Sequence, residues 1–256
     1  MRSSLARLAA AAALAPVIAA AALPDEIQVY ASDINKQGEF GLELHVNTTP
    51  SGRSTPDFPG EIAPAHGWRF TPEFSYGVTP SLEAGLYLSF VHGAGDRDRF
   101  SAPKLRLKWM ALRVDEDGNG AFAGVNFEYA WISSDLEQAT RAGEVRPILG
   151  WRNREWLVAA NPILDFDFAG PNKGERPSFA PAVKVARRVV EGLAAGLEYY
   201  GDFGPVGRFA ARAGQSHSLF LAFDVDRAPW VFNVGVGRGW NAADRWTVKA
   251  IFDIPL

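Results

Sequence analysis

The chain has 256 residues, a formal net charge of −3 and no cysteine, and its mean hydropathy is close to zero. Without cysteine it can form neither a disulfide framework nor a thiolate metal site, and its mild acidity argues against nucleic acid as a partner. Aromatic residues are abundant, with 8 Trp and 17 Phe. A helical membrane protein would be far more apolar. A membrane β-barrel alternates lipid-facing and water-facing residues, so its mean hydropathy is close to zero.

Residues 1–22 have the pattern of a secretory signal peptide. Arg2 and Arg7 precede an apolar run from residue 8 to residue 22, which ends in three alanines. Its removal takes away two arginines and no acidic residue, so the formal net charge changes from −3 to −5. Residues 23–38 are then expected to form a periplasmic N-terminal arm. No second long apolar stretch follows, so no membrane-spanning helix is expected.

Downstream of residue 38, apolar and polar residues alternate with a period of two, which is typical of β-strands. Long and short connections between the alternating segments also alternate strictly. An even number of strands with this arrangement is typical of bacterial outer-membrane proteins, so the sequence predicts an all-β fold: a single 12-stranded antiparallel transmembrane barrel spanning residues 39–256. The main alternative is a soluble β-sandwich or barrel, which would not need apolar outward faces on every strand. The predicted strands are residues 39–48, 67–78, 82–90, 104–111, 123–131, 144–151, 155–168, 179–189, 193–200, 219–225, 230–236 and 246–256.

The spacing of apolar residues around two short turns predicts how the flanking strands pair, with Trp151 opposite Trp156 and Val225 opposite Trp230. The tryptophans test the barrel independently, because membrane barrels concentrate aromatic residues at the two lipid–water interfaces. Seven of them lie beside predicted loops or turns, and Trp109 alone lies in the middle of a predicted strand.

The last strand, residues 246–256, resembles the closing strand of bacterial outer-membrane barrels, although it ends in Leu256 where such strands usually end in an aromatic residue. This resemblance implies that the barrel-insertion machinery recognises the C-terminal strand and that outer-membrane lipid surrounds the barrel. Residues 70–79, FTPEFSYGVT, followed by LEAGLY at residues 82–87, are similar to a hairpin of proteobacterial outer-membrane barrels of the transporter-like group, which includes proteins of a MetA-type phenol-degradation pathway. The similarity implies an outer-membrane barrel of a Gram-negative bacterium, used for passive uptake, and assigns no functional residue.

If the apolar faces meet lipid, the polar faces line the lumen. The sign of their charges alternates from the third predicted strand to the ninth, and strands about 4.8 Å apart bring such side chains within reach of one another. One interpretation is a ladder of ion pairs that braces a polar interior, and another is a pore whose charged walls orient a solute. The two interpretations are compatible. The predicted lumen-lining residues are Glu43, His45, Arg69, Glu73, Glu83, Arg106, Lys108, Glu128, Arg146, Arg152, Asp165, Asp167, Lys184, Arg188, Glu198 and Asp224.

Residues 115–120, DEDGNG, match the first half of a calcium-binding loop. The twelfth position of such a loop should be Glu and is Asn126, so a tight turn rich in Asp, Asn and Gly is the simpler explanation.

Two further patterns have a catalytic interpretation and a simpler one. Ser216, His217 and Ser218 could belong to an outer-membrane lipase, yet residues of one strand share a face only at a spacing of two, so His217 points away from both serines. Asp165 and Asp167 share a face and could act as an acid–base pair or bind a cation. The basic residues predicted on neighbouring strands favour ion pairing instead.

The sequence therefore predicts a porin or passive channel for small solutes or ions, with a charged lumen, no enzymatic activity, no cofactor and no bound metal. A structural or adhesive barrel closed by its own salt bridges is the first alternative. An outer-membrane enzyme acting on lipid is the second, and it would need a nucleophile and a base on one face.

Overall fold

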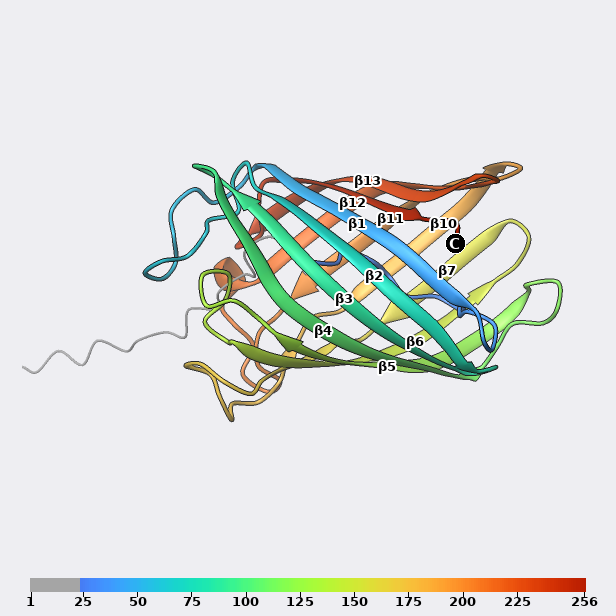
Figure 1. Ribbon diagram of the computed structural model, residues 1–256, viewed down its shortest axis with the longest axis horizontal. Helices are drawn as coiled ribbons and strands as arrows, with labels where there is room; N and C mark the ends of the chain where they lie inside the picture. The colour runs from blue at the N-terminus through green and yellow to red at the C-terminus, as the bar shows by residue number, and fades with distance from the viewer. Residues whose placement is uncertain (1–23) are drawn as a thin grey trace, which may run out of the picture.

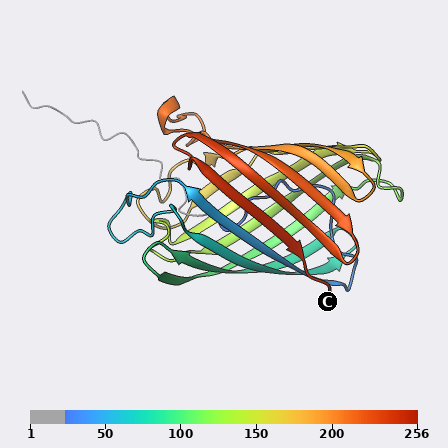
Figure 2. The same ribbon diagram turned by 90° about the horizontal axis from the view of Figure 1, so that it is seen from above.

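The computed structural model describes residues 24–256, which form one closed antiparallel β-barrel (Figures 1 and 2). The expected signal peptide, residues 1–22, lies outside the described residues. The sheet closes because β1 pairs with β14 at one seam and β5 pairs with β6 at the other end of the strand order. The described part of the chain contains no helix long and apolar enough to cross a membrane.

The wall consists of 12 strands, two of which are interrupted, so that 14 segments carry labels. A short 3-10 helix, η1 (Arg212–Gly214), lies between β11 and β12. The segments are β1 (Phe40–Ser51), β2 (Trp68–Thr79), β3 (Leu82–Gly93), β4 (Arg97–Leu112), β5 (Gly120–Trp131), β6 (Arg141–Arg152), β7 (Trp156–Asn161), β8 (Leu164–Asp167), β9 (Ser178–Phe179), β10 (Ala182–Val190), β11 (Leu193–Asp202), β12 (Ser216–Arg227), β13 (Trp230–Asn241) and β14 (Trp246–Asp253).

Prolines interrupt two of the predicted strands. Pro162 separates β7 from β8 and Pro181 separates β9 from β10, since proline has no N–H to donate to a neighbouring strand. The two interruptions face each other, because the Ala180 N–H donates to the Ile163 carbonyl oxygen over 3.0 Å. Strands predicted as continuous at residues 155–168 and 179–189 are therefore each broken once.

The alternation of apolar and polar residues becomes an outer and an inner face. In β2, Trp68 and Phe70 are 43% and 39% exposed, whereas Arg69 between them is 4% exposed. Every second side chain of a strand points to the same side, so one face of the wall is apolar and the other is polar. The prediction of an all-β, 12-stranded antiparallel barrel is confirmed.

The connections alternate between the two ends of the barrel, and the four longest lie at the same end (Figure 1). Residues 52–67, 132–140, 168–177 and 203–215 lie at one end, called the long-loop end here, and residues 80–81, 153–155, 191–192 and 228–229 lie at the other, the short-turn end. One expected loop is mostly strand: β4 begins at Arg97, and Phe90 pairs with Phe100.

All 8 tryptophans are exposed on the outside of the barrel. Trp109 is not in the middle of the wall as predicted, because it pairs with Leu82, the first residue after a short turn. It therefore lies near the short-turn end, in the aromatic zone expected at a lipid interface.

Both predicted hairpin pairings are displaced by two residues. Trp151 pairs with Val158 rather than Trp156, and Val225 pairs with Phe232 rather than Trp230. In the first hairpin the Asn153 side chain accepts the backbone N–H groups of Glu155 and Trp156, which widens the turn. A displacement of two residues keeps every side chain on its predicted face, so the pattern alone cannot detect it.

Candidate functional site

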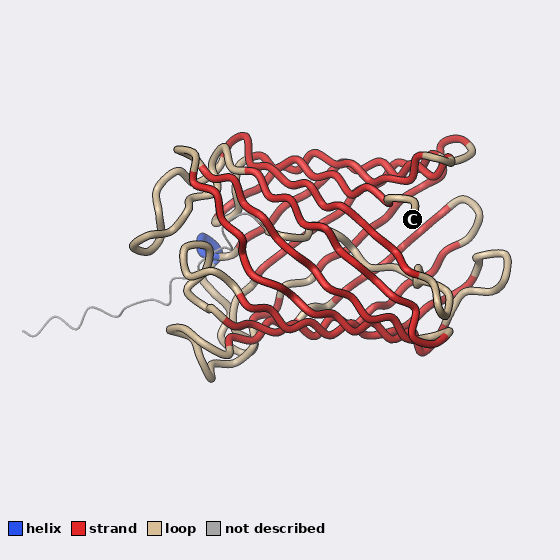
Figure 3. The backbone as a smooth tube through the Cα atoms, in the orientation of Figure 1, coloured by secondary structure: helices blue, strands red, loops and turns tan. Residues whose placement is uncertain are grey.

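Residues 24–35, called the interior arm here, run through the barrel from the long-loop end toward the short-turn end, where β1 begins (Figure 3). The expected periplasmic arm at residues 23–38 is therefore, over most of its described length, inside the barrel. Its composition explains the placement. Val29 and Tyr30 pack on an apolar patch of the inner wall that includes Met110, Phe122 and Ile148, and the acidic residues of the arm neutralise basic side chains of the wall.

Side chains of the wall hold the backbone of the interior arm. Among the described residues, no backbone–backbone hydrogen bond joins residues 24–35 to a strand. Each bond comes from a polar side chain instead, which satisfies buried backbone groups that have no strand partner. The bonds are Asn47 Nδ2 to Pro24 O (3.0 Å) and Asp25 O (3.2 Å), Lys249 Nζ to Ile27 O (2.9 Å), Arg146 Nη1 to Gln28 O (3.2 Å), Asn161 to both Tyr30 N and Tyr30 O, Lys108 Nζ to Asp33 O (2.5 Å), and Asn35 N to Glu83 Oε2 (2.7 Å).

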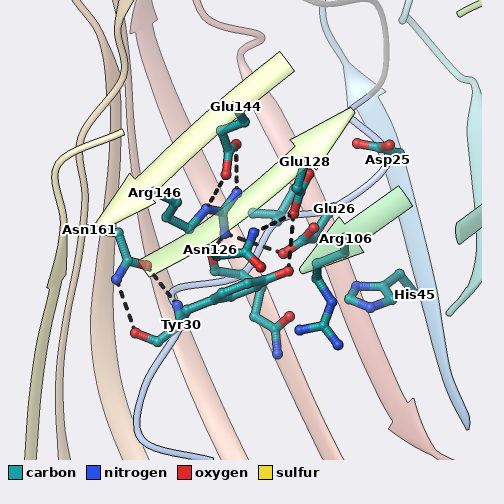
Figure 4. Close-up of polar contacts among 12 residues, drawn as sticks. Asp25, Glu26, Tyr30, His45, Arg106, Asn126, Glu128, Glu144, Arg146 and Asn161 are labelled. Carbon is teal, nitrogen blue, oxygen red and sulfur yellow. Dashed lines mark hydrogen bonds and ion pairs between the residues drawn. The ribbon is translucent and has the colours of Figure 1, made fainter. Parts of the chain in front are cut away.

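A layer of buried charges surrounds the middle of the interior arm (Figure 4). The Glu26 carboxylate lies 3.3 Å from Arg146 and 3.2 Å from Lys104. Lys104 also lies 2.8 Å from Glu128. Below these residues the Tyr30 and Tyr87 hydroxyls are 2.6 Å apart. The wall cations in this layer are at most 8% exposed, and buried charges at this depth require partners.

The layer divides the lumen into two cavities. One, at the long-loop end, has a volume of about 470 Å³ and is lined by Glu26, Lys104 and Glu137 among others. The second, at the short-turn end, has a volume of about 840 Å³ and is lined by Tyr30 and Asp33 among others. The two cavities share no lining residue in the described chain. The interior arm and the charged layer thus lie between the two cavities.

The residues predicted to line the lumen all lie on the inner side of the wall. Arg69, Glu128, Asp165 and Asp167 line the long-loop cavity. His45 and Arg146 are buried. The short-turn cavity is lined by Glu43, Glu73, Glu83, Arg106, Lys108, Arg152, Lys184, Arg188, Glu198 and Asp224.

Several of the inward charges pair across strands, as the ladder interpretation expects. Arg106 Nη2 lies 2.6 Å from both Glu73 Oε1 and Glu83 Oε1. Lys184 Nζ lies 3.1 Å from Glu198 and 2.7 Å from Asp224.

The predicted alternation of charge fails on one side of the barrel. Glu128 is in register with Glu144, and Glu144 is in register with Asp165, so three carboxylates lie side by side. Among the described residues neither Asp165 nor Asp167 forms an ion pair, contrary to expectation. The candidate basic partners Arg152, Lys184 and Arg188 line the other cavity instead, and Arg146 turns toward Glu144 and Glu26.

The list of predicted lumen-lining residues lacks several residues of this site, among them Lys249, Asn161, Lys104 and Glu26. The inward position of Lys249 could have been recognised from the sequence, because this residue alternates with the outward-facing Val248 and Ala250 in the last strand. It is 1% exposed and contacts the Glu198 carboxylate. No sequence pattern indicates the position of Glu26, because it depends on the path of the interior arm through the barrel.

Local hydrogen bonds account for two motifs that the sequence analysis considered as a calcium loop and a lipase site. In the turn at residues 115–120, Asp115 Oδ1 accepts the Asn119 N–H over 2.7 Å, which closes the turn on itself. His217 contacts Tyr199 OH at 2.7 Å and Gln215 Oε1 at 3.2 Å, and neither adjacent serine is a partner in the described chain.

The surroundings of one carboxyl group at the long-loop end raise its pKa. Glu137 belongs to the loop at residues 132–140 and lines the long-loop cavity. Burial raises the pKa of Glu137 to about 7, and the carboxylates of Asp25 and Asp167 add to the effect, which Arg69 and Lys104 partly offset. This group changes charge near neutral pH.

No protein-family model matches the chain, and no curated protein does. Among solved structures, an outer-membrane channel from Pseudomonas putida F1 is similar over 90% of this chain and 100% of its own length, with a TM-score of 0.58 and 12% identity. The translocator domain of the autotransporter NalP from Neisseria meningitidis has a TM-score of 0.43 at 9% identity, covering 87% of this chain and 89% of its own. The porin OmpF of Salmonella typhi has a TM-score of 0.38 at 9% identity, covering 84% and 97%. The first likeness shows that the chain has the fold of an outer-membrane channel.

Proposed function

We propose that this protein is a channel of a Gram-negative outer membrane for passive passage of small solutes or ions, and that the interior arm is its movable closure. One observation carries the proposal: two cavities with charged residues in their linings lie one above the other in the lumen, and an arm without backbone hydrogen bonds to the wall lies between them. The similar structure is that of a channel rather than an enzyme, which agrees with a non-enzymatic role.

The way the arm is attached supports its movement. Every wall strand is held by backbone hydrogen bonds to neighbours on both sides, and β14 for example pairs with both β1 and β13. The interior arm contributes nothing to this ladder. Its departure would therefore leave the barrel closed and intact while joining the cavities of about 470 and 840 Å³. Volumes of this order suit small molecules.

The alternative of a structural barrel with a closed lumen is also supported by an observation. The arm pairs its acidic side chains with wall cations, for example Glu26 with Arg146 and Lys104. Removing one partner of a buried ion pair is costly. A barrel of this kind would keep its arm in place permanently.

Tethering the arm separates these two functions. Ser32 Oγ lies 2.8 Å from Arg152 Nη1, and the chain has no cysteine. The double variant Ser32→Cys/Arg152→Cys can therefore be bridged with a bifunctional methanethiosulfonate, which forms a reducible disulfide with each thiol and releases methanesulfinate. We expect conductance steps in a planar bilayer from the reduced barrel, their loss on bridging, and their return on reduction. The single variant Ser32→Cys, treated in the same way, should conduct throughout.

Two results would overturn the proposal. Silence from the unmodified barrel, shown to be folded by heat-modifiable gel migration, would favour the closed structural barrel. Undiminished conductance after complete bridging would mean that solutes bypass the arm.

A further inference from the structure

Three side chains that the proposed channel does not use converge at the inner face of β1 and β2. Glu43 and His45 are two residues apart on β1 and share its inner face, and Glu73 lies directly opposite Glu43 on β2. His45 Nε2 is 3.6 Å from Glu43 Oε2 and 3.2 Å from Glu73 Oε2. One donor atom from each of the three lies within 4.8 Å of the others.

The cluster carries an unbalanced charge. Like charges directly opposite on antiparallel strands repel each other, so the Glu43–Glu73 pair is unfavourable unless something positive lies between them. Of the two Glu73 carboxylate oxygens, Arg106 contacts Oε1 at 2.6 Å, and Oε2 is turned toward His45. Glu43 has no basic partner other than His45 among the described residues. The two carboxylates therefore favour a positive charge between them, which either the His45 imidazole or a bound cation can supply.

The imidazole is buried behind the two carboxylates. His45 is 0% exposed, and its Nδ1 has no hydrogen-bond partner. Its ring lies 6.1 Å from that of Tyr87, on the inner side of the wall shown in Figure 4. Nε2 points between the carboxylates, and Glu43 and Glu73 both line the short-turn cavity, which gives an ion a route from solvent.

We infer that Glu43, His45 and Glu73 bind one divalent transition-metal ion of the zinc type. Ligands about 2.0–2.1 Å from a tetrahedral ion lie roughly 3.3 Å apart, and the observed nitrogen–oxygen distances are 3.2 and 3.6 Å. One imidazole with two carboxylates suits Zn²⁺ or Co²⁺, whereas Mg²⁺ and Ca²⁺ prefer oxygen ligands alone. The fourth position faces the cavity, where water completes the site. Arg106 and Lys108 line the same cavity and limit the affinity by repelling the ion.

Metal titration of the folded barrel in detergent tests this inference, after chelator treatment and dialysis. We expect one Zn²⁺ per chain by calorimetry and a visible Co²⁺ absorption band of a tetrahedral site. Loss of a ligand in His45→Gln or Glu43→Gln should weaken binding by more than the roughly 10–100-fold that loss of an outer-shell partner costs. Glu43 is 38% exposed in its side chain, so its variant should fold even if the His45 variant does not.

His92 supplies a matched control, because it lies 2.7 Å from Asp98 and 3.9 Å from Asp96 but is exposed on a hairpin at the long-loop end. Binding should be unchanged in His92→Gln and in a large excess of Mg²⁺. The inference is overturned if the unmodified barrel binds no Zn²⁺, if Glu43→Gln binds it equally well, or if only His92→Gln loses it. None of these readouts depends on conductance, so they are independent of the proposed channel.

Discussion

The side-chain amide of Asn161 binds both backbone polar groups of Tyr30. The Tyr30 N–H donates to Asn161 Oδ1 over 2.7 Å, and Asn161 Nδ2 donates to the Tyr30 carbonyl oxygen over 3.1 Å. Asn161 is the last residue of β7 before the interruption at Pro162, and it is fully buried. A wall side chain here takes the place of a neighbouring strand, which fixes the arm inside the barrel.

Asn161→Leu should loosen the interior arm. The substitution keeps a similar volume but leaves two buried backbone groups of Tyr30 without partners, each at a cost of about 1–3 kcal/mol. With a cysteine introduced at Ala31, which is 9% exposed, we expect faster labelling by a polar thiol reagent. Asn172→Leu, in an exposed loop, is the control and should not change the rate. Equal rates for the Asn161 and Asn172 variants would show that the amide does not hold the arm.

Lys249→Met should destabilise the whole barrel. Lys249 is 1% exposed, contacts the Glu198 carboxylate and donates to the Ile27 carbonyl oxygen over 2.9 Å. Removing one member of a buried ion pair costs about 3–5 kcal/mol. The free energy of unfolding in urea, followed by tryptophan fluorescence, should fall by that order. Lys36→Met is the control, since the Lys36 side chain is 84% exposed, and a similar loss in both variants would contradict the prediction.

Arg188→Glu should shift the ion selectivity of the open channel toward cations. Arg188 lines the short-turn cavity and forms no ion pair within the described residues, so its reversal changes the charge of the wall without breaking a contact. Arg106 is unsuitable for this test because it bridges Glu73 and Glu83. The neighbouring Arg187 stacks on Trp156 on the outer face, and Arg187→Glu should leave the reversal potential in a salt gradient unchanged. A shift in both variants, or in neither, would argue against a pore past Arg188.

Stability should depend on pH through Glu137. The pKa of Glu137 is about 7 in the folded barrel and about 4.5 when exposed, so the folded state favours the protonated carboxyl. Between these values the folded state binds more protons than the unfolded one, and stability therefore falls as the pH rises from about 4.5 to about 7 and levels off above. Glu137→Gln should remove this component. The difference in unfolding free energy between the two proteins, measured from pH 4 to pH 8, would be constant if the prediction were wrong.

The architecture of the wall follows from local pattern. The period of two in segments such as residues 246–253 determines which side chains face outward, whatever the exact pairing. Two-residue connections such as residues 191–192 are too short for a crossover, so they join antiparallel neighbours. In the hairpins around Asn153 and Pro229 the predicted pairing is two residues out of register, and the side chains still point to the predicted inner or outer face. The inner positions of Arg106, Glu83 and Lys184 were predictable for the same reason.

The path of the interior arm through the lumen could not be predicted in this way. Residues 24–35 have no strand period, and their place inside the barrel results from distant contacts, such as Glu26 with Arg146 and Tyr30 with Asn161. The convergence of His45 with Glu73 likewise depends on the register between β1 and β2. A sequence by itself determines the direction of a side chain from its strand, because that is a local property of the backbone. Which residues meet across the lumen depends on the register and on the path of the arm, and only the tertiary structure decided these.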